Sequence, residues 1–112
     1  MGELSDGRAE SAGATGEGVL VRVEGRVQGV GFRAFVRARA QALGVSGWTC
    51  NLPDGAVAVA MSGPSDAVGA LRSALASGPT GASVTRVREM GPVPVAAGEP
   101  FQVVRRPPTG AG

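Results

Sequence analysis

One stretch of the chain combines glycines with an arginine in a pattern suited to binding an anion. Residues 25–33 read Gly-Arg-Val-Gln-Gly-Val-Gly-Phe-Arg and follow an apolar run that is typical of a strand. Successive N–H groups in a glycine-rich turn converge on an anion, and the N-terminus of a following helix adds positive potential. Arg33 stands where that helix should begin, at the end of the helix dipole that disfavours a cation. An anion between Arg33 and the amides would resolve this conflict, so the stretch predicts a phosphate-binding loop.

The residue types that the chain lacks exclude most other chemistry. It contains no His, and all eleven of its basic residues are Arg. Ser-His-Asp and Cys-His catalysis and His-ligated zinc are therefore excluded, as are catalytic and nucleotide-binding lysines. The single cysteine, Cys50, excludes an internal disulfide and a thiolate-rich metal site. Any chemistry must use Arg, carboxylates, amides, hydroxyls and the backbone.

Length and composition indicate one domain between two polar tails. A chain of 112 residues suffices for a single core. Residues 1–17 are small and acidic and predict a disordered leader, residues 18–106 predict the domain, and 107–112 predict a short disordered tail. No apolar run approaches the ~18 residues of a membrane span, and no signal peptide is evident. We therefore expect a cytoplasmic protein.

Apolar periodicity switches between two and about 3.6 residues in a regular order along the domain. Strands are predicted at 19–24, 45–51, 56–61, 84–88 and 101–105, and helices at 32–43 and between the breakers 63–66 and 78–79. The Pro-rich residues 92–100 predict a connection. This β-α-β-β-α-β order with a short C-terminal strand predicts an α+β, ferredoxin-like split β-α-β sandwich, with two helices on one face of an antiparallel sheet.

The loop and the residues behind it resemble the acylphosphatases over about residues 18–105. The matching residues beyond the loop are Leu43-Gly44, Gly47-Trp48, Asn51, Asp54-Gly55, Gly63, Gly78-Pro79, Ala82 and Val84. The resemblance implies hydrolysis of the carboxyl-phosphate anhydride of acyl phosphates to carboxylate and inorganic phosphate. It also implies that the reaction needs no metal, no cofactor and no phosphoenzyme.

The resemblance further implies a role for each site residue. The phosphoryl oxygens would be held by the amides of Gln28, Gly29, Val30, Gly31, Phe32 and Arg33. The planar guanidinium of Arg33 can hold two of those oxygens at once. Asn51 matches the family's catalytic asparagine and would orient the attacking water. Phosphoryl transfer mainly needs positioning and charge stabilisation, and a carboxylate leaves without a strong acid, so a chain without His or Lys is sufficient.

Some of these residues also have a purely structural interpretation. Asn51 before a Leu-Pro-Asp-Gly segment is a common turn former, and Asp54-Gly55 suits turn chemistry alone. Trp48 is expected to pack in the core or at its rim, and Cys50 to fill space in a strand. Arg26 either adds positive field to the loop or lies on the surface.

Parts of the sequence also suit three functions other than that of an acylphosphatase. Residues 29–34 satisfy a G-x-G-x-x-A dinucleotide fingerprint, but the domain is too short for a doubly wound sheet. A non-catalytic phosphate- or carbamoyl-phosphate-binding module, as in hydrogenase-maturation carbamoyltransferases, is the alternative that stays open. RNA-binding sheets need exposed strand aromatics, whereas Phe32 and Phe35 belong to the predicted helix. We expect a monomer with a small acyl phosphate substrate and with no nucleic acid or membrane partner.

Overall fold

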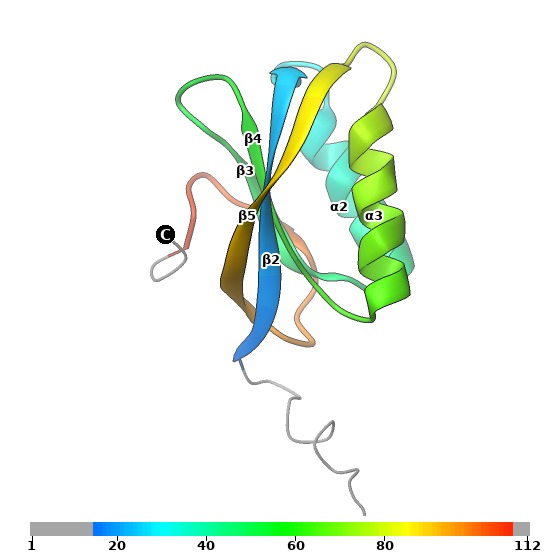
Figure 1. The fold of residues 1–112 in the computed structure, drawn as a ribbon, viewed down its shortest axis with the longest axis vertical. Helices are drawn as coiled ribbons and strands as arrows, with labels where there is room; N and C mark the ends of the chain where they lie inside the picture. The colour runs from blue at the N-terminus through cyan, green and yellow to red at the C-terminus, as the bar shows by residue number, and fades with distance from the viewer. Residues whose placement is uncertain (1–14, 109–112) are drawn as a thin grey trace, which may run out of the picture.

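Strands and helices follow one another in the order that the periodicity predicts (Figure 1). The computed structural model describes residues 15–108. Its elements are β2 (Thr15–Arg26), α2 (Phe32–Leu43), β3 (Ser46–Asn51), β4 (Val57–Ser62), α3 (Ser65–Ser77), β5 (Ser83–Ala96) and β6 (Gln102–Val103). Both helices lie on one face of the sheet, so the predicted ferredoxin-like α+β fold is confirmed. Neither helix of the described segment is long and apolar enough to cross a bilayer.

The five strands form one sheet in the order β5-β2-β4-β3-β6. The first four pair antiparallel, but β6 runs parallel to β3, with Trp48 opposite Gln102 and Thr49 opposite Val103. The prediction of a purely antiparallel sheet was therefore wrong at this edge. β5 and β6 lie at opposite edges, so the chain crosses the sheet before it pairs again. β6 has only two residues, too few to show an apolar pattern. The sequence therefore did not indicate the direction of this strand.

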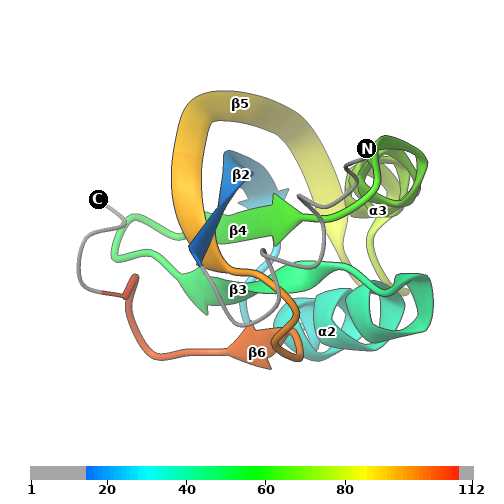
Figure 2. The ribbon, with the colours of Figure 1, turned by 90° about the horizontal axis from the view of Figure 1, so that it is seen from below.

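Strand β5 is longer than its sequence predicts. It continues through Pro92 and Pro94 to Ala96, where the prolines predicted a connection. Proline is tolerated here because β5 is an edge strand. Its pairing with β2 shifts register between Leu20 and Val21 and again between Glu24 and Gly25. Such irregularities bend a strand, and Figure 2 shows β5 arching around β2.

The long β5 also moves the start of the ordered domain. β2 begins at Thr15, which pairs with Ala96, so residues 15–17 of the predicted leader belong to the sheet. Those three residues were predicted to be disordered because they contain no large apolar side chain. Backbone pairing with β5 holds them instead. The remainder of the predicted leader, and residues 109–112 of the predicted tail, lie outside the described residues.

Apolar side chains fill both faces of the sheet. On the face under the helices, strand residues such as Val23 and Val59 pack against helix residues such as Val36 and Leu71. The opposite face carries a smaller cluster of Trp48, Cys50, Ala58, Ala60, Val93 and Val95. The arch of β5 covers this second face, so β4 is buried along almost its whole length.

Candidate active site

The predicted phosphate-binding loop connects β2 to α2 and depends on two glycines. Gly29 and Gly31 have φ angles of 76° and 77°, in the left-handed region. A Cβ atom at either position would meet no atom within 4 Å, so the backbone conformation and not the space requires glycine. Gly31 is the N-cap of α2 and has no side chain with which to cap the helix. The loop therefore leaves the helix N-terminus open.

The amides of this loop are free to bind an anion. The first hydrogen bond of α2 joins Phe35 N to Gly31 O at 3.0 Å. In the part of the chain that the structure describes, the backbone bonds of turns and caps use none of the N–H groups of residues 28–34 as donors. The first turn of α2 holds no acidic residue, and it includes the half-buried Arg33. Free amides, the positive end of a helix and a guanidinium thus occur together.

Asn51 ends β3 on the side of the sheet that faces the helices. It pairs with Val57, and directly paired residues share a face; Val57 packs in the core under the helices. Within the described residues, Asn51 Oδ1 is the only buried side-chain oxygen without a hydrogen-bond partner. A buried acceptor without a partner is costly. It is therefore a position where a bound water or ligand would be stabilised.

Gln28 brings the loop and Asn51 together. Its side-chain Nε2 donates to Leu52 O at 2.8 Å and to Ala56 O at 2.9 Å. Leu52 directly follows Asn51, so the loop is bonded to the turn that begins where β3 ends. Both segments lie at the upper end of the sheet in Figure 1. The sequence indicated only a backbone role for Gln28, because nothing local shows which carbonyls its side chain reaches.

Arg33 lies close enough to the end of β3 for its charge to act there. Burial raises the pKa of the Cys50 thiol, and the positive charge of Arg33 opposes that shift. Burial is the larger effect, so the thiol stays protonated near neutral pH. Cys50 is fully buried in the cluster on the far face, which agrees with the predicted role of a strand filler.

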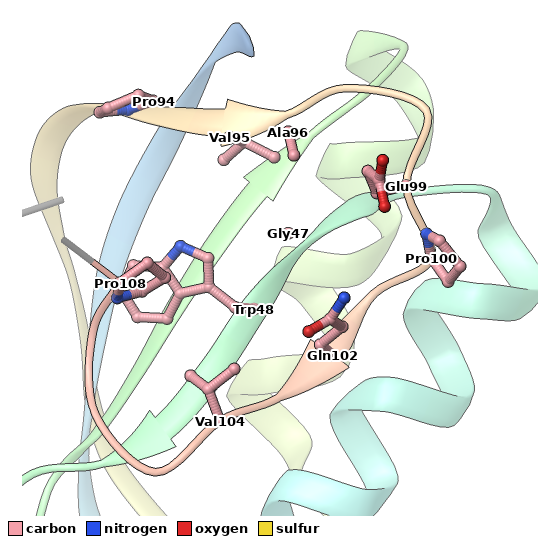
Figure 3. Close-up of a pocket in the computed structure, with 10 residues that line it drawn as sticks. All are labelled: Gly47, Trp48, Pro94, Val95, Ala96, Glu99, Pro100, Gln102, Val104 and Pro108. Atoms are coloured by element: carbon pink, nitrogen blue, oxygen red, sulfur yellow. The ribbon is translucent and has the colours of Figure 1, made fainter. Parts of the chain in front are cut away.

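Trp48 contacts the apolar cluster on the face of the sheet away from the helices. Trp48 is 6% exposed and packs in the far-face cluster, as predicted. It lines a cavity of about 260 Å³ with Pro94, Glu99 and Gln102 (Figure 3), which the phosphate-binding loop does not reach.

Asp54 accepts a hydrogen bond from Ala56 N at 3.2 Å, as a turn residue does. It also forms an ion pair with Arg22, which the sequence analysis missed because the two residues are 32 positions apart.

Comparison with known proteins gives the family. The family model described as acylphosphatase matches residues 19–95, which include the loop, Arg33 and Asn51. The chain belongs to the acylphosphatase family. The predicted resemblance is thus confirmed, and the family supports acylphosphatase activity, which is that of a hydrolase.

Individual relatives agree with this assignment. The chain is 43% identical over 86 residues to an acylphosphatase from Methanothrix thermoacetophila, covering 77% of this chain and 94% of the relative. A solved structure of an acylphosphatase from Coxiella burnetii is 36% identical, with a TM-score of 0.71, and the match covers 79% of this chain and 93% of that one. HypF from T. kodakarensis is 26% identical with a TM-score of 0.69, but only 12% of its length is covered. The acylphosphatase fold therefore also occurs as a small part of a longer protein.

Proposed function

We propose that this acylphosphatase hydrolyses the carboxyl-phosphate anhydride of small acyl phosphates. In this proposal the amides of residues 28–33 and the guanidinium of Arg33 hold the phosphoryl group, and Asn51 orients the attacking water. One observation carries it: free amides at the start of α2 are tied, through Gln28, to the strand end where Asn51 Oδ1 lacks a partner.

The loop suits a phosphoryl group because it offers several donors and a fixed charge. Gly29 and Gly31 adopt left-handed φ angles, and turns of this kind can direct successive N–H groups toward one anion. Arg33 adds two donors in one plane, which matches two equatorial oxygens. As negative charge redistributes over these oxygens during transfer, donors already in place stabilise the transition state.

Asn51 suits a water because its free oxygen is an acceptor. Oδ1 can accept a hydrogen bond from a water and so direct a lone pair of that water toward phosphorus. An amide is too weak a base to remove the proton near neutral pH, so in this proposal the proton passes to a phosphate oxygen of the substrate. The carboxylate leaves without protonation by the protein.

Measurements of phosphate binding and of turnover distinguish the proposed role of Arg33 from that of Asn51. Arg33→Ala is expected to lower kcat/KM on benzoyl phosphate by about 10²–10³ or more, and Arg33→Lys to fail similarly because an ammonium lacks the planar two-point contact. Arg33→Ala should also weaken competitive inhibition by inorganic phosphate. Asn51→Ala should lower kcat by about 10²–10³ while phosphate inhibition changes little.

Full activity in Arg33→Ala or Asn51→Ala would contradict the assignment of that residue. Phosphate binding without hydrolysis by the unaltered chain would favour the second candidate, a non-catalytic phosphate- or carbamoyl-phosphate-binding module. The likeness to a small part of HypF is the observation that supports this candidate. An assay in excess chelator tests the proposed independence from metal and cofactor.

We also propose that the protein acts as a cytoplasmic monomer without a nucleic acid partner. Met90 is the only large apolar side chain exposed among the described residues, which leaves little apolar surface for self-association. Phe32, Trp48 and Phe101 are at most 6% exposed, so they offer no platform for stacked bases. The cytoplasmic location stays a prediction from the composition.

A further inference from the structure

The turn between β3 and β4 is held by hydrogen bonds on two sides. On one side, Gln28 Nε2 donates to Leu52 O and Ala56 O at 2.8 and 2.9 Å. On the other, Asp54 Oδ2 accepts from an Arg22 guanidinium nitrogen, while Asp54 Oδ1 accepts from Ala56 N at 3.2 Å. Arg22 and Gln28 lie on β2 and on the loop that follows it. Both contacts therefore anchor the turn to one continuous segment.

We infer that the Arg22–Asp54 ion pair positions the active site by fixing this turn. The inference rests on the proposed function, because it gives the turn the role of keeping Asn51 in register with the phosphate-binding loop. Neither Arg22 nor Asp54 belongs to the proposed phosphate cradle. They are positioning residues, acting through the backbone of the turn.

Arg22 is held by the sheet and by a carboxylate of its own strand. It lies in β2, between β5 and β4 in the sheet. Its Nε donates to Glu24 Oε2 at 2.8 Å, and the same oxygen accepts from Arg88 of β5 at 3.3 Å. The side chain of Arg22 is 25% exposed, so its motion is restricted. The guanidinium therefore reaches Asp54 from a strand that is paired on both sides.

Losing this pair is expected to affect rate more than stability. Exposed ion pairs contribute little to folding, and the Asp54 side chain is 55% exposed. Small displacements of reacting groups, by contrast, lower rates strongly. Gln28 still holds the turn when the pair is absent. The loss should therefore be smaller than the hundredfold or more expected for Asn51→Ala.

The test compares the pair with a second ion pair on the same molecule, whose carboxylate is similarly exposed and whose arginine is somewhat more exposed. Asp54→Asn removes the charge but keeps an oxygen that can accept from Ala56 N, and Arg22→Met removes the guanidinium. The matched control is Arg72→Met with Glu89→Gln, which breaks an ion pair of 2.6 Å between α3 and β5. All variants are assayed for kcat and KM on benzoyl phosphate, for inhibition by inorganic phosphate and for thermal unfolding.

We expect Asp54→Asn and Arg22→Met each to lower kcat about three- to tenfold, with KM and phosphate inhibition changed less than twofold. The double variant should lose no more than either single variant, since both break one contact, and Arg22→Lys should retain more of kcat than Arg22→Met. The control variants should keep full kcat at a similar unfolding temperature.

Three results would overturn the inference. These are an unchanged kcat in Asp54→Asn and Arg22→Met, an equal loss of kcat in the control pair, or losses that multiply in the double variant. Failure of the proposed function would be seen elsewhere, as retained activity in Arg33→Ala or Asn51→Ala. The two failures are therefore distinguishable in one set of assays.

Discussion

At the scale of single residues, Gln28 has two proposed roles in the candidate site, one for its backbone amide and one for its side chain. Its amide belongs to the proposed phosphate cradle, whereas its side chain bonds two carbonyls of the turn after Asn51. Those carbonyls keep other donors: Gly55 N for Leu52 O, and Leu52 N for Ala56 O. The side chain can therefore be removed without leaving either acceptor unpaired.

Gln28→Ala is expected to lower the rate of hydrolysis more than the stability of the fold. The free energy of unfolding should fall by only about 1 kcal/mol, while kcat/KM on benzoyl phosphate should fall about tenfold as the loop loses its tie to the turn. Gln41→Ala is the control, because Gln41 makes one bond of 3.3 Å to Phe101 O on another part of the surface. Equal rates in Gln28→Ala and the unaltered protein would show that the Gln28 side chain has no role in the site.

Gly47 is a second residue whose role only its surroundings explain. It lies in β3 at a φ of 144°, and a Cβ atom there would be 1.8 Å from Ala60 O of β4. Gly47→Ala combines a disfavoured backbone conformation with overpacking, and we expect it to lower the free energy of unfolding by about 3 kcal/mol or more.

The matched control for Gly47 is Gly69 in the interior of α3. A Cβ atom at Gly69 meets nothing within 4 Å, so Gly69→Ala should raise stability by roughly 0.5–1 kcal/mol through helix propensity. Urea unfolding of both variants measures the contrast. A Gly47→Ala protein as stable as the unaltered one would show that β3 and β4 separate without cost at this point.

At the scale of elements, the last segment belongs to the core although the family match ends before it. The acylphosphatase model matches up to residue 95, yet Phe101 is 2% exposed and packs in the cluster under the helices. Phe101→Ala should therefore cost about 3–5 kcal/mol, the usual effect of removing a buried phenyl ring. Phe35→Ala, at a half-buried position on α2, should cost less. Equal losses in denaturant unfolding would contradict a core role for the final segment.

The elements also show where sequence patterns succeed and where they fail. Both helices were predicted because apolar residues recur at helical spacing and glycines and prolines flank them. β5 was predicted only as far as residue 88, because prolines at 92 and 94 interrupt the pattern. Its edge position makes those prolines acceptable, and an edge position is a property of the whole sheet.

At the scale of the whole molecule, a charge network joins β5, β2 and the β3–β4 turn. Arg22 donates to both Asp54 and Glu24, and Arg88 also donates to Glu24. The pKa of Asp54 lies below its ordinary value of 3.8, first because of the bond from Arg22 and then because of the bond from Ala56 N. The pKa of Glu24 lies below 4.5, chiefly because of the bond from Arg22.

These lowered pKa values predict a loss of stability in acid. Both carboxyls bind protons less readily in the folded chain than in the unfolded chain, so their contribution is complete above the unfolded values. The contribution of Glu24 is lost as the pH falls below 4.5 and through the lower pKa of Glu24 in the folded chain. The contribution of Asp54 is lost in the same way below 3.8. Thermal unfolding followed across this range should decline less steeply in Asp54→Asn and Glu24→Gln variants. Identical slopes in all three proteins would contradict a folded-state role for the network.

The order of the elements and the family could be determined from the sequence by itself, and the phosphate-binding loop could be predicted from it. Each rests on residues close together in the chain: a repeating apolar pattern, a contiguous motif, or a turn with its flanking glycine. Roles for Arg33 and Asn51 followed from the same motifs and stay predictions.

The tertiary structure alone decided the direction of β6, the arch of β5, and the contacts that Gln28 and Arg22 make with the turn after β3. Gln28 reaches partners 24 and 28 positions away, and Arg22 reaches one 32 positions away. Such contacts exist only after the sheet has assembled, because the energy that selects them comes from packing between distant segments. No local pattern of residues encodes these contacts.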